Sequence, residues 1–391
     1  MKNTITLFLL SGFTLLLLAF IQVSHAESDN GIVETIKQAN DAQLVFSSLE
    51  FDQTNRGIIN INGYDRHFSV NFPPSYDAET VYPVVLFFHG CMCRPNFTRE
   101  TILDYLDWSP RMESFKKDFI IIKMSAFSEK KPVVQAENGG ARGMWFWHEG
   151  LTSDRDDYAF VDTLLEELLS SSDISIDPEK IFGVGHSSGA IFLLSYVLGG
   201  PTDLTDISIN DTYKFRAISV KGGSTFREGV VDFKENTPNT LPSVLHIQGE
   251  QDKGLWFNGT ETGKSGLNFL DFAQPSPPII LDGLRDTVHG RTYSAWDENT
   301  PSNTSTLERW ATHLNLKYSG YEDHLQYYLY NFAPKAASDK ILIGMRVKDC
   351  GHSFPAGQVQ ADFLKIFSKQ NGDLKAFDSK YSKDTAIKFC R

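Results

Sequence analysis

The eight residues GVGHSSGA (183–190) constrain the fold of this chain more than any other stretch. They join an apolar run typical of a buried strand, KIFGVG (180–185), to a segment with helical character, SGAIFLLSYVLGG (188–200). A serine between two glycines at such a junction is typical of a nucleophile elbow, whose strained turn lifts the hydroxyl above the sheet. The glycines omit β-carbons that would collide in so tight a bend. We therefore interpret Ser187 as a candidate nucleophile.

Strand-like and helical segments alternate along most of the chain. Apolar runs typical of buried strands cover residues 82–90, 118–127, 215–223, 241–249 and 340–352. The stretch DDYAFVDTLLEELLSS (156–171) has helical spacing. This alternation predicts an α/β fold with a mostly parallel central sheet flanked by helices. The half-alternating runs at 57–62 and 66–74 favour an antiparallel hairpin. Residues 253–305, which precede His352, form a loop-rich insertion that is either functional or disordered.

The chain begins with a segment typical of secretory signal peptides. Lys2 precedes a long apolar stretch, and Ser24-His25-Ala26 places small residues where a signal peptidase cleaves. Cleavage would remove residues 1–26 and leave 391 − 26 = 365 residues, which we expect to form one catalytic domain, 27–391. An uncleaved membrane anchor is the alternative. We expect the protein to be secreted, to the periplasm or the extracellular space, and not to be attached to a membrane after cleavage. The oligomeric state does not follow from the sequence.

Charge and cysteine spacing argue against two kinds of binding. The formal net charge of −12 makes nucleic acid a poor partner, because phosphate binding needs a basic surface. The cysteines are Cys91, Cys93, Cys350 and Cys390, which in an oxidising compartment suggest two disulfides with three possible pairings. A Cys91–Cys93 ring would be strained. Cys-Met-Cys lacks the clustered ligands of a metal site, so we expect no metal. A serine nucleophile requires no organic cofactor, and we expect none.

A serine nucleophile requires a base, and at such an elbow the chain order is Ser, then Asp or Glu, then His. Asp252 follows the run 241–249, and His352 follows the apolar part of 340–352. Active sites of open α/β sheets collect at such strand ends. We therefore predict a Ser187–Asp252–His352 triad. Glu250 and Asp286 are the alternative acids. The competing histidines are His89, His148, His186, His246, His289 and His313.

Stabilisation of an oxyanion requires hydrogen-bond donors beside the nucleophile. The backbone N–H of Ser188, the residue after the nucleophile, is one candidate. The run VVLFFHGCMC places His89-Gly90 directly after a buried strand, so the N–H of Cys91 is the second. The alternative interpretation is that His89-Gly90 only ends the strand and has no role in catalysis.

These motifs, in this order, resemble those of the secreted polyhydroxybutyrate depolymerase and feruloyl/acetylxylan esterase group of α/β-hydrolases. LFFHGC resembles its oxyanion segment, MWFWHEG (144–150) its Trp-rich stretch, LERWATHLN (307–315) its WAxxNGC helix and DCGHSFPAG its histidine loop. The resemblance implies an α/β-hydrolase fold, the triad above and an oxyanion hole from Cys91 and Ser188. Met144 and Leu316 stand where the group often has cysteines, so the disulfide pattern differs.

The resemblance implies a serine esterase acting on polyhydroxybutyrate-type polyesters or oligoesters, or on feruloyl or acetyl esters of plant polysaccharide. A serine peptidase or a non-catalytic, hydrolase-like binding protein would be compatible with the same fold. We expect the loops that carry Cys91, Cys93 and Cys350 to be neighbours in the folded site, and we therefore expect a disulfide from Cys350 to Cys91 or Cys93. Aromatic side chains are expected to line the substrate pocket, with core packing as the alternative: Trp145, Trp147, Trp256, Phe257 and Phe354.

Overall fold

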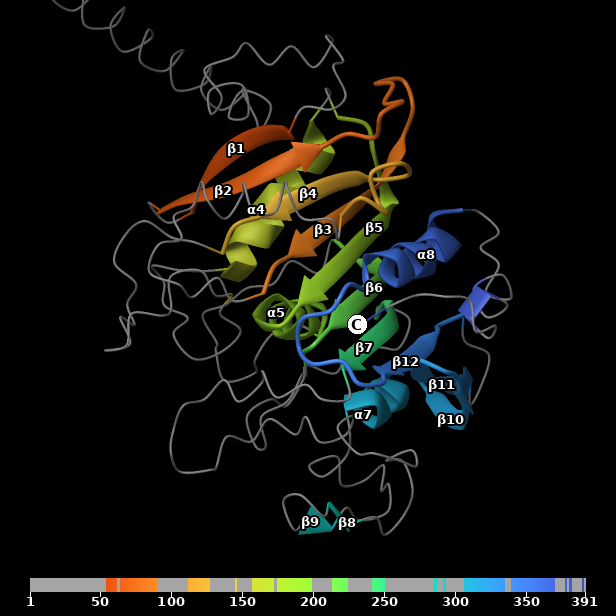
Figure 1. Ribbon diagram of the computed structural model, residues 1–391. Helices are drawn as coiled ribbons and strands as arrows, with labels where there is room; N and C mark the ends of the chain where they lie inside the picture. The colour runs from red at the N-terminus through yellow and green to blue at the C-terminus, as the bar shows by residue number, and fades with distance from the viewer. Residues whose placement is uncertain are drawn as a thin grey trace, which may run out of the picture.

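A computed structural model of the chain describes most of the sheet and the helices packed on it (Figure 1). The described residues are 54–61, 64–90, 112–126, 145, 157–171, 174–198, 213–223, 241–249, 285–286, 291–292, 306–334, 339–369, 377, 380–381 and 389. The proposed signal peptide, Asp252 and nearly all of the 253–305 insertion lie outside them.

Ten strands form one sheet in the order β1-β2-β4-β3-β5-β6-β7-β12-β11-β10. The six strands from β4 to β12 are parallel, and β1–β2 is an antiparallel hairpin, as predicted. This is the α/β-hydrolase type of fold. The strands are β1 (Thr54–Ile61), β2 (Tyr64–Asn71), β3 (Tyr82–Phe88), β4 (Ile120–Met124), β5 (Ile176–His186), β6 (Phe215–Lys221), β7 (Ser243–Gly249), β10 (Leu316–Asp323), β11 (Tyr327–Pro334) and β12 (Leu342–Val347).

Two further strands, β8 (Arg285–Asp286) and β9 (Arg291–Thr292), pair separately within the 253–305 region. The antiparallel hairpin β10–β11 extends the sheet beyond β12, and the sequence patterns did not indicate it. No helix in the described part of the chain has both the length and the apolar character needed to cross a membrane.

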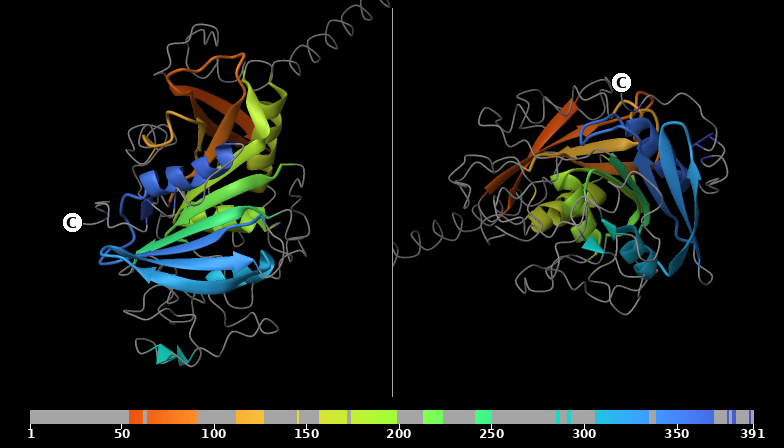
Figure 2. Two further views of the ribbon diagram at one scale, coloured as in Figure 1. Left: turned by 90° about the vertical axis from the view of Figure 1, so that its right-hand side faces the viewer. Right: turned by 60° about the horizontal axis from the view of Figure 1, so that its bottom comes forward.

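The central strands are apolar on both faces because helices cover both sides of the sheet (Figure 2). Along β3, Val84, Leu86 and Phe88 belong to one core cluster, whereas Val85 and Phe87 belong to the other. The first cluster includes residues of α4 (Asp157–Ser170), α5 (Ser188–Val197) and α7 (Thr306–His313). The second includes residues of α8 (Gly357–Ser368). The continuous apolar runs in the sequence are therefore strands buried on two sides.

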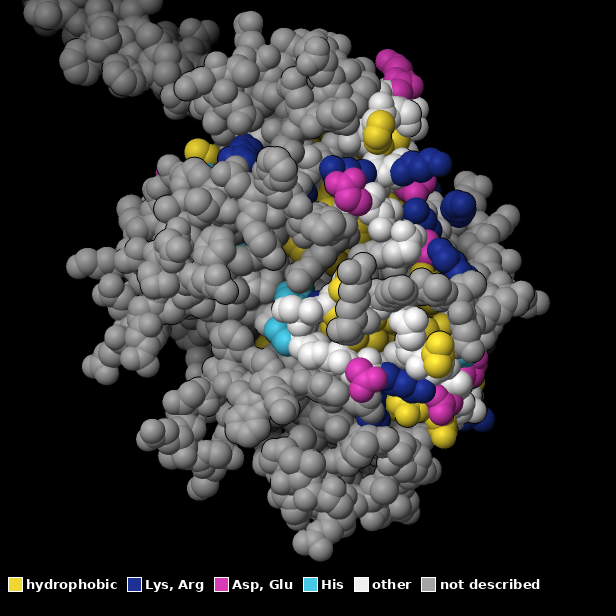
Figure 3. Space-filling model, viewed as in Figure 1, with side chains coloured by type: hydrophobic (Ala, Val, Ile, Leu, Met, Phe, Trp, Pro, Cys, Tyr) yellow, Lys and Arg dark blue, Asp and Glu magenta, His cyan; other side chains and the backbone are white. Residues whose placement is uncertain are grey.

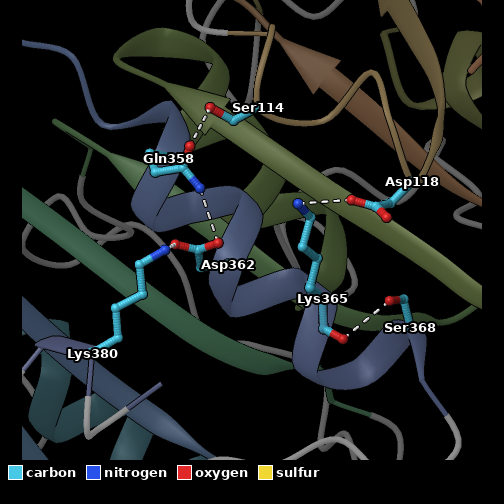
Figure 4. A network of polar contacts seen from close by, with 7 residues as sticks. All are labelled: Ser114, Asp118, Gln358, Asp362, Lys365, Ser368 and Lys380. Atoms are coloured by element: carbon cyan, nitrogen blue, oxygen red, sulfur yellow. Dashed lines mark hydrogen bonds and ion pairs between the residues drawn. The ribbon is translucent and has the colours of Figure 1, made fainter. Parts of the chain in front are cut away.

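Helix α8 is attached to the segment before β4 by polar contacts along its outer side (Figure 4). Ser114 Oγ donates to Gln358 Oε1 at 3.1 Å, and Lys365 Nζ lies 2.7 Å from Asp118 Oδ2. Asp362 accepts from Gln358 at 3.0 Å and pairs with Lys380. Since α8 begins five residues after His352, these contacts fix the far end of the histidine loop.

The parallel strands end in register at one edge of the sheet. His186 of β5 lies beside Lys221 of β6, and Gly249 of β7 lies beside Val347 of β12. The loops that follow these strands therefore all emerge at the same edge, which is where ligands bind in open α/β sheets.

One buried histidine predicts a pH-dependent stability. His246 of β7 is 2% exposed, its Nε2 donates to the carbonyl oxygen of Gly223 at 2.6 Å, and burial lowers its pKa to about 4. The unfolded chain protonates this ring near pH 6.5 and the folded chain does not, so stability is lost as the pH falls from about 6.5 towards 4. We expect a loss of about 2 kcal/mol between pH 7 and pH 5 from this group.

Urea unfolding of the wild type and His246→Gln at both pH values measures this contribution. The glutamine can still donate to Gly223 but does not titrate, so the variant should lose about 2 kcal/mol less over the same interval. An equal pH dependence in the two proteins would contradict the assignment.

Candidate active site

Ser187 occupies a sharp turn between β5 and α5, as the sequence predicts. Its backbone has φ 53° and ψ −121°, a conformation that a residue with a side chain adopts at a cost of about 1–3 kcal/mol. Two hydrogen bonds hold it: Ser187 N–H donates to the Lys221 carbonyl oxygen at 2.9 Å, and Ile191 N–H donates to the Ser187 carbonyl oxygen at 3.0 Å. The first ties the turn to β6, and the second begins α5.

Both glycines of the elbow are required by backbone that approaches closely. A β-carbon on Gly185 would lie 2.6 Å from Ala190 Cα, and one on Gly189 would lie 2.3 Å from the Phe88 carbonyl oxygen. The neighbouring atoms belong to α5 and β3, so no side-chain rotation could make room. The Gly-x-Ser-x-Gly pattern is thus explained by contacts between the elbow and its two neighbouring elements.

The segment after β3 lies directly against the elbow. A β-carbon on Gly90 would lie 2.6 Å from His186 Nδ1 and 3.1 Å from Ser187 Cβ. The buried His89 ring accepts from Ala126 N–H through Nε2 at 3.0 Å, so its Nδ1 carries the proton and donates to the Gly90 carbonyl oxygen at 2.6 Å. The Gly90 peptide is therefore fixed beside the serine. Cys91, the next residue, lies outside the described residues.

The histidine loop reaches the elbow from β12. The rings of His352 and His186 are 5.1 Å apart between centroids, and His186 Nε2 lies 3.5 Å from the His352 carbonyl oxygen. In the view of Figure 1, the loop after β12 curves past the start of α5, and Figure 3 shows histidine side chains at the surface there. His352 thus lies beside His186, the residue that precedes Ser187. Of the competing histidines, His148 and His289 lie outside the described residues.

The end of β7 contacts this loop. A β-carbon on Gly249 would lie 2.3 Å from the Gly351 carbonyl oxygen and 2.5 Å from that of Cys350. Asp252, three residues further on, lies outside the described residues, so its triad role stays a prediction. Cys350 is disulfide-bonded, and since Cys91, Cys93 and Cys390 also lie outside, the pairing stays a prediction as well.

Two aromatic residues expected to line a pocket belong to the core. Trp145 is fully buried and packs 5.2 Å from Phe88 and 5.0 Å from Phe192 between ring centroids. Phe354 is 2% exposed and belongs to the core cluster on the α8 side. Both pack in the core, and their expected role in lining a substrate pocket stays a prediction. Trp147, Trp256 and Phe257 lie outside the described residues.

Sequence reasoning missed one charged residue at this edge, Lys221, which ends the apolar run of β6. Its side chain is 2% exposed, and its Nζ contacts the histidine loop. A lysine closing a buried strand, directly before Gly222 and Gly223, was the available signal. Within the described part of the chain, no cluster of three or more His, Cys, Asp or Glu side chains is arranged to hold a metal ion.

No family model and no curated protein matches the sequence. Among solved structures, it is similar to S-formylglutathione hydrolase from Agrobacterium tumefaciens, at 13% identity, a TM-score of 0.43 and coverage of 85% of this chain and 97% of that one. A ferulic acid esterase from Anaeromyces mucronatus is 14% identical over 83% of this chain and 92% of its own, with a TM-score of 0.34. The Bacillus cereus carboxylesterase is 18% identical over 48% and 72%, with a TM-score of 0.30.

The elbow geometry predicts that two glycines of one strand respond differently to the same change. Gly185→Ala should lower the free energy of unfolding by about 1–3 kcal/mol, because the new methyl group meets the backbone of α5. Gly183→Ala is the matched control, since its methyl group meets mainly the flexible end of the Leu193 side chain, at 2.9 Å. Urea unfolding of both variants checks this. A loss in Gly183→Ala as large as that in Gly185→Ala would refute the close-approach argument.

Proposed function

We propose that this protein is a serine carboxylic-ester hydrolase with Ser187 as its nucleophile. The observation that carries the proposal is the strained turn of Ser187 between β5 and α5, with the His352 loop beside it. A positive φ at a residue other than glycine persists only where the surrounding structure enforces it, and such strain concentrates at functional sites. A serine that served only as a linker would not need this conformation.

In the proposed mechanism, His352 accepts the Ser187 proton as Oγ attacks the ester carbonyl carbon. Asp252 orients the imidazole ring and stabilises its protonated form. Collapse of the tetrahedral intermediate breaks the bond to the alcohol, which leaves with the proton from His352. Water, activated by the same histidine, then hydrolyses the acyl-serine. The contact of Gly249 with Gly351 supports a partnership between Asp252 and His352, because it joins the two loops that carry them.

The proposed oxyanion hole consists of the N–H groups of Ser188 and Cys91. Ser188 is the first residue of α5, so its N–H lies at the positive end of a helix dipole. Gly90, which precedes Cys91, lies against Ser187 Cβ and is fixed by His89. These placements support both donors, and removal of one such donor typically costs about 10²–10³-fold in kcat.

For the substrate, we propose polyhydroxybutyrate-type polyesters or oligoesters, acted on outside the cell after signal cleavage behind Ala26. Esters of ferulate or acetate on plant polysaccharide are the alternative for the same machinery. A side-by-side release assay separates them: amorphous polyhydroxybutyrate in one tube, feruloylated arabinoxylan in the other. Hydroxybutyrate release would support the polyester proposal. Ferulate release alone would replace it, and release from neither would direct the search to small soluble esters.

Ser187→Ala should lower ester hydrolysis by about 10⁴-fold or more, because the variant lacks the hydroxyl on which the acyl intermediate forms. Purified mature wild type and variant are compared on whichever ester the wild type hydrolyses. Ser195→Ala is the control. It removes a buried serine hydroxyl of α5, 2.8 Å from Tyr158 OH, and should leave turnover within a few-fold. Undiminished turnover in Ser187→Ala would remove the proposed triad.

The disulfide of Cys350 offers a test that does not depend on catalysis. Because the loop after β12 and the segment after β3 converge on the elbow, we expect Cys350 to pair with Cys91 or Cys93. Peptide mapping of the purified protein under non-reducing conditions identifies the partner. A Cys350–Cys390 pair or a free thiol at Cys350 would contradict this expectation.

A further inference from the structure

We propose that Lys221 is a positioning residue that holds the His352 loop in place beside Ser187. The catalytic part of this inference rests on the proposed function. The contacts that motivate it do not, since they concern only how β6 and the histidine loop are joined.

The Lys221 ammonium group binds the histidine loop at two points. Its Nζ donates to the carbonyl oxygen of His352 at 3.3 Å and to that of Phe354 at 2.9 Å. It also lies 4.6 Å from the centroid of the Phe354 ring, a cation–π distance. The carbonyl groups of the two residues that flank Ser353 are therefore bound by one cation.

The other end of the same residue holds the elbow. The carbonyl oxygen of Lys221 accepts the Ser187 N–H at 2.9 Å, and Lys221 is the register neighbour of His186. His186 Nε2 lies 3.5 Å from the same His352 carbonyl oxygen that Lys221 binds. One residue thus joins the proposed nucleophile through its backbone and the proposed base through its side chain.

Burial indicates that the charge itself matters. Lys221 is only 2% exposed, and an ammonium group is strongly hydrated, so removing it from water is costly unless its donors are used. An apolar side chain of similar size would fill the space without that cost. Hydrogen bonds from a charged donor are about twice as strong as neutral ones, which suits the fixing of a loop by its carbonyl groups.

A histidine that acts as a general base is sensitive to small displacements, since a misplacement of about 1 Å can cost about 10²-fold in rate. We therefore expect Lys221→Met, which keeps the length and removes the donors, to lower kcat by about 10- to 100-fold with KM changed less than about threefold. Backbone amide exchange followed by mass spectrometry should be faster in peptides covering 349–356, and unchanged in peptides covering β3.

Lys123→Met is the matched control. Lys123 is equally buried, at 1% exposure, but lies on β4, which β3 separates from the elbow strand. It measures what the loss of a buried ammonium group does to the protein in general, and it should leave kcat and the exchange of 349–356 unchanged. If Lys221→Met does not fold, Lys221→Gln is the second variant. Its shorter neutral amide should give the same changes with smaller amplitude.

The outcomes separate the two proposals. Wild-type kcat and unchanged exchange of 349–356 in a folded Lys221 variant would overturn the positioning role, whatever the activity. Equal losses of kcat in the Lys221 and Lys123 variants would also overturn it, because the effect would then be general destabilisation. Faster exchange of 349–356 in a protein whose wild type hydrolyses no ester would support the contact and reject the proposed function instead.

Discussion

The site depends on the hydrogen bond from Ser187 N–H to the carbonyl oxygen of Lys221. It joins the end of β5 to the end of β6 at the point where the chain turns into α5, and it holds the serine backbone at φ 53°. That backbone conformation is stable only because the neighbouring elements leave no room for a different conformation of the turn. The strain at Ser187 is therefore supported by the packing of the whole parallel sheet.

Close backbone contacts extend this arrangement to the loops that follow the neighbouring strands. Gly189 meets the end of β3, Gly90 meets the side chains of His186 and Ser187, and Gly249 meets the histidine loop. In each place a glycine stands where a β-carbon would displace backbone or a side chain of the site. Lys221 adds a charged contact to the histidine loop, so that the ends of β3, β5, β6 and β7 and the start of α5 are held together.

Much of this architecture could be predicted from local pattern. The buried parallel strands correspond to continuous apolar runs in the sequence, and the elbow corresponds to the two glycines around Ser187. The β10–β11 hairpin was missed because β10 is half-exposed, and Gly320 stands where the apolar alternation of Leu316 and Tyr318 would continue. Helix α8 was missed because it begins at Gly357 after Ala356, which makes no capping hydrogen bond. Lys221 was missed because its partners are backbone carbonyls 131 and 133 residues away, which no local pattern encodes.

The identity of the nucleophile is tested most directly by finding which residue of the protein a covalent, serine-directed reagent modifies. The purified protein is treated with a fluorophosphonate, which reacts covalently with activated serines, and the digested product is analysed by mass spectrometry. We predict a single adduct on Ser187 that forms far more slowly in His352→Gln. A protein that stays unlabelled, or that carries its adduct on another residue, would contradict the assignment of Ser187 as the nucleophile.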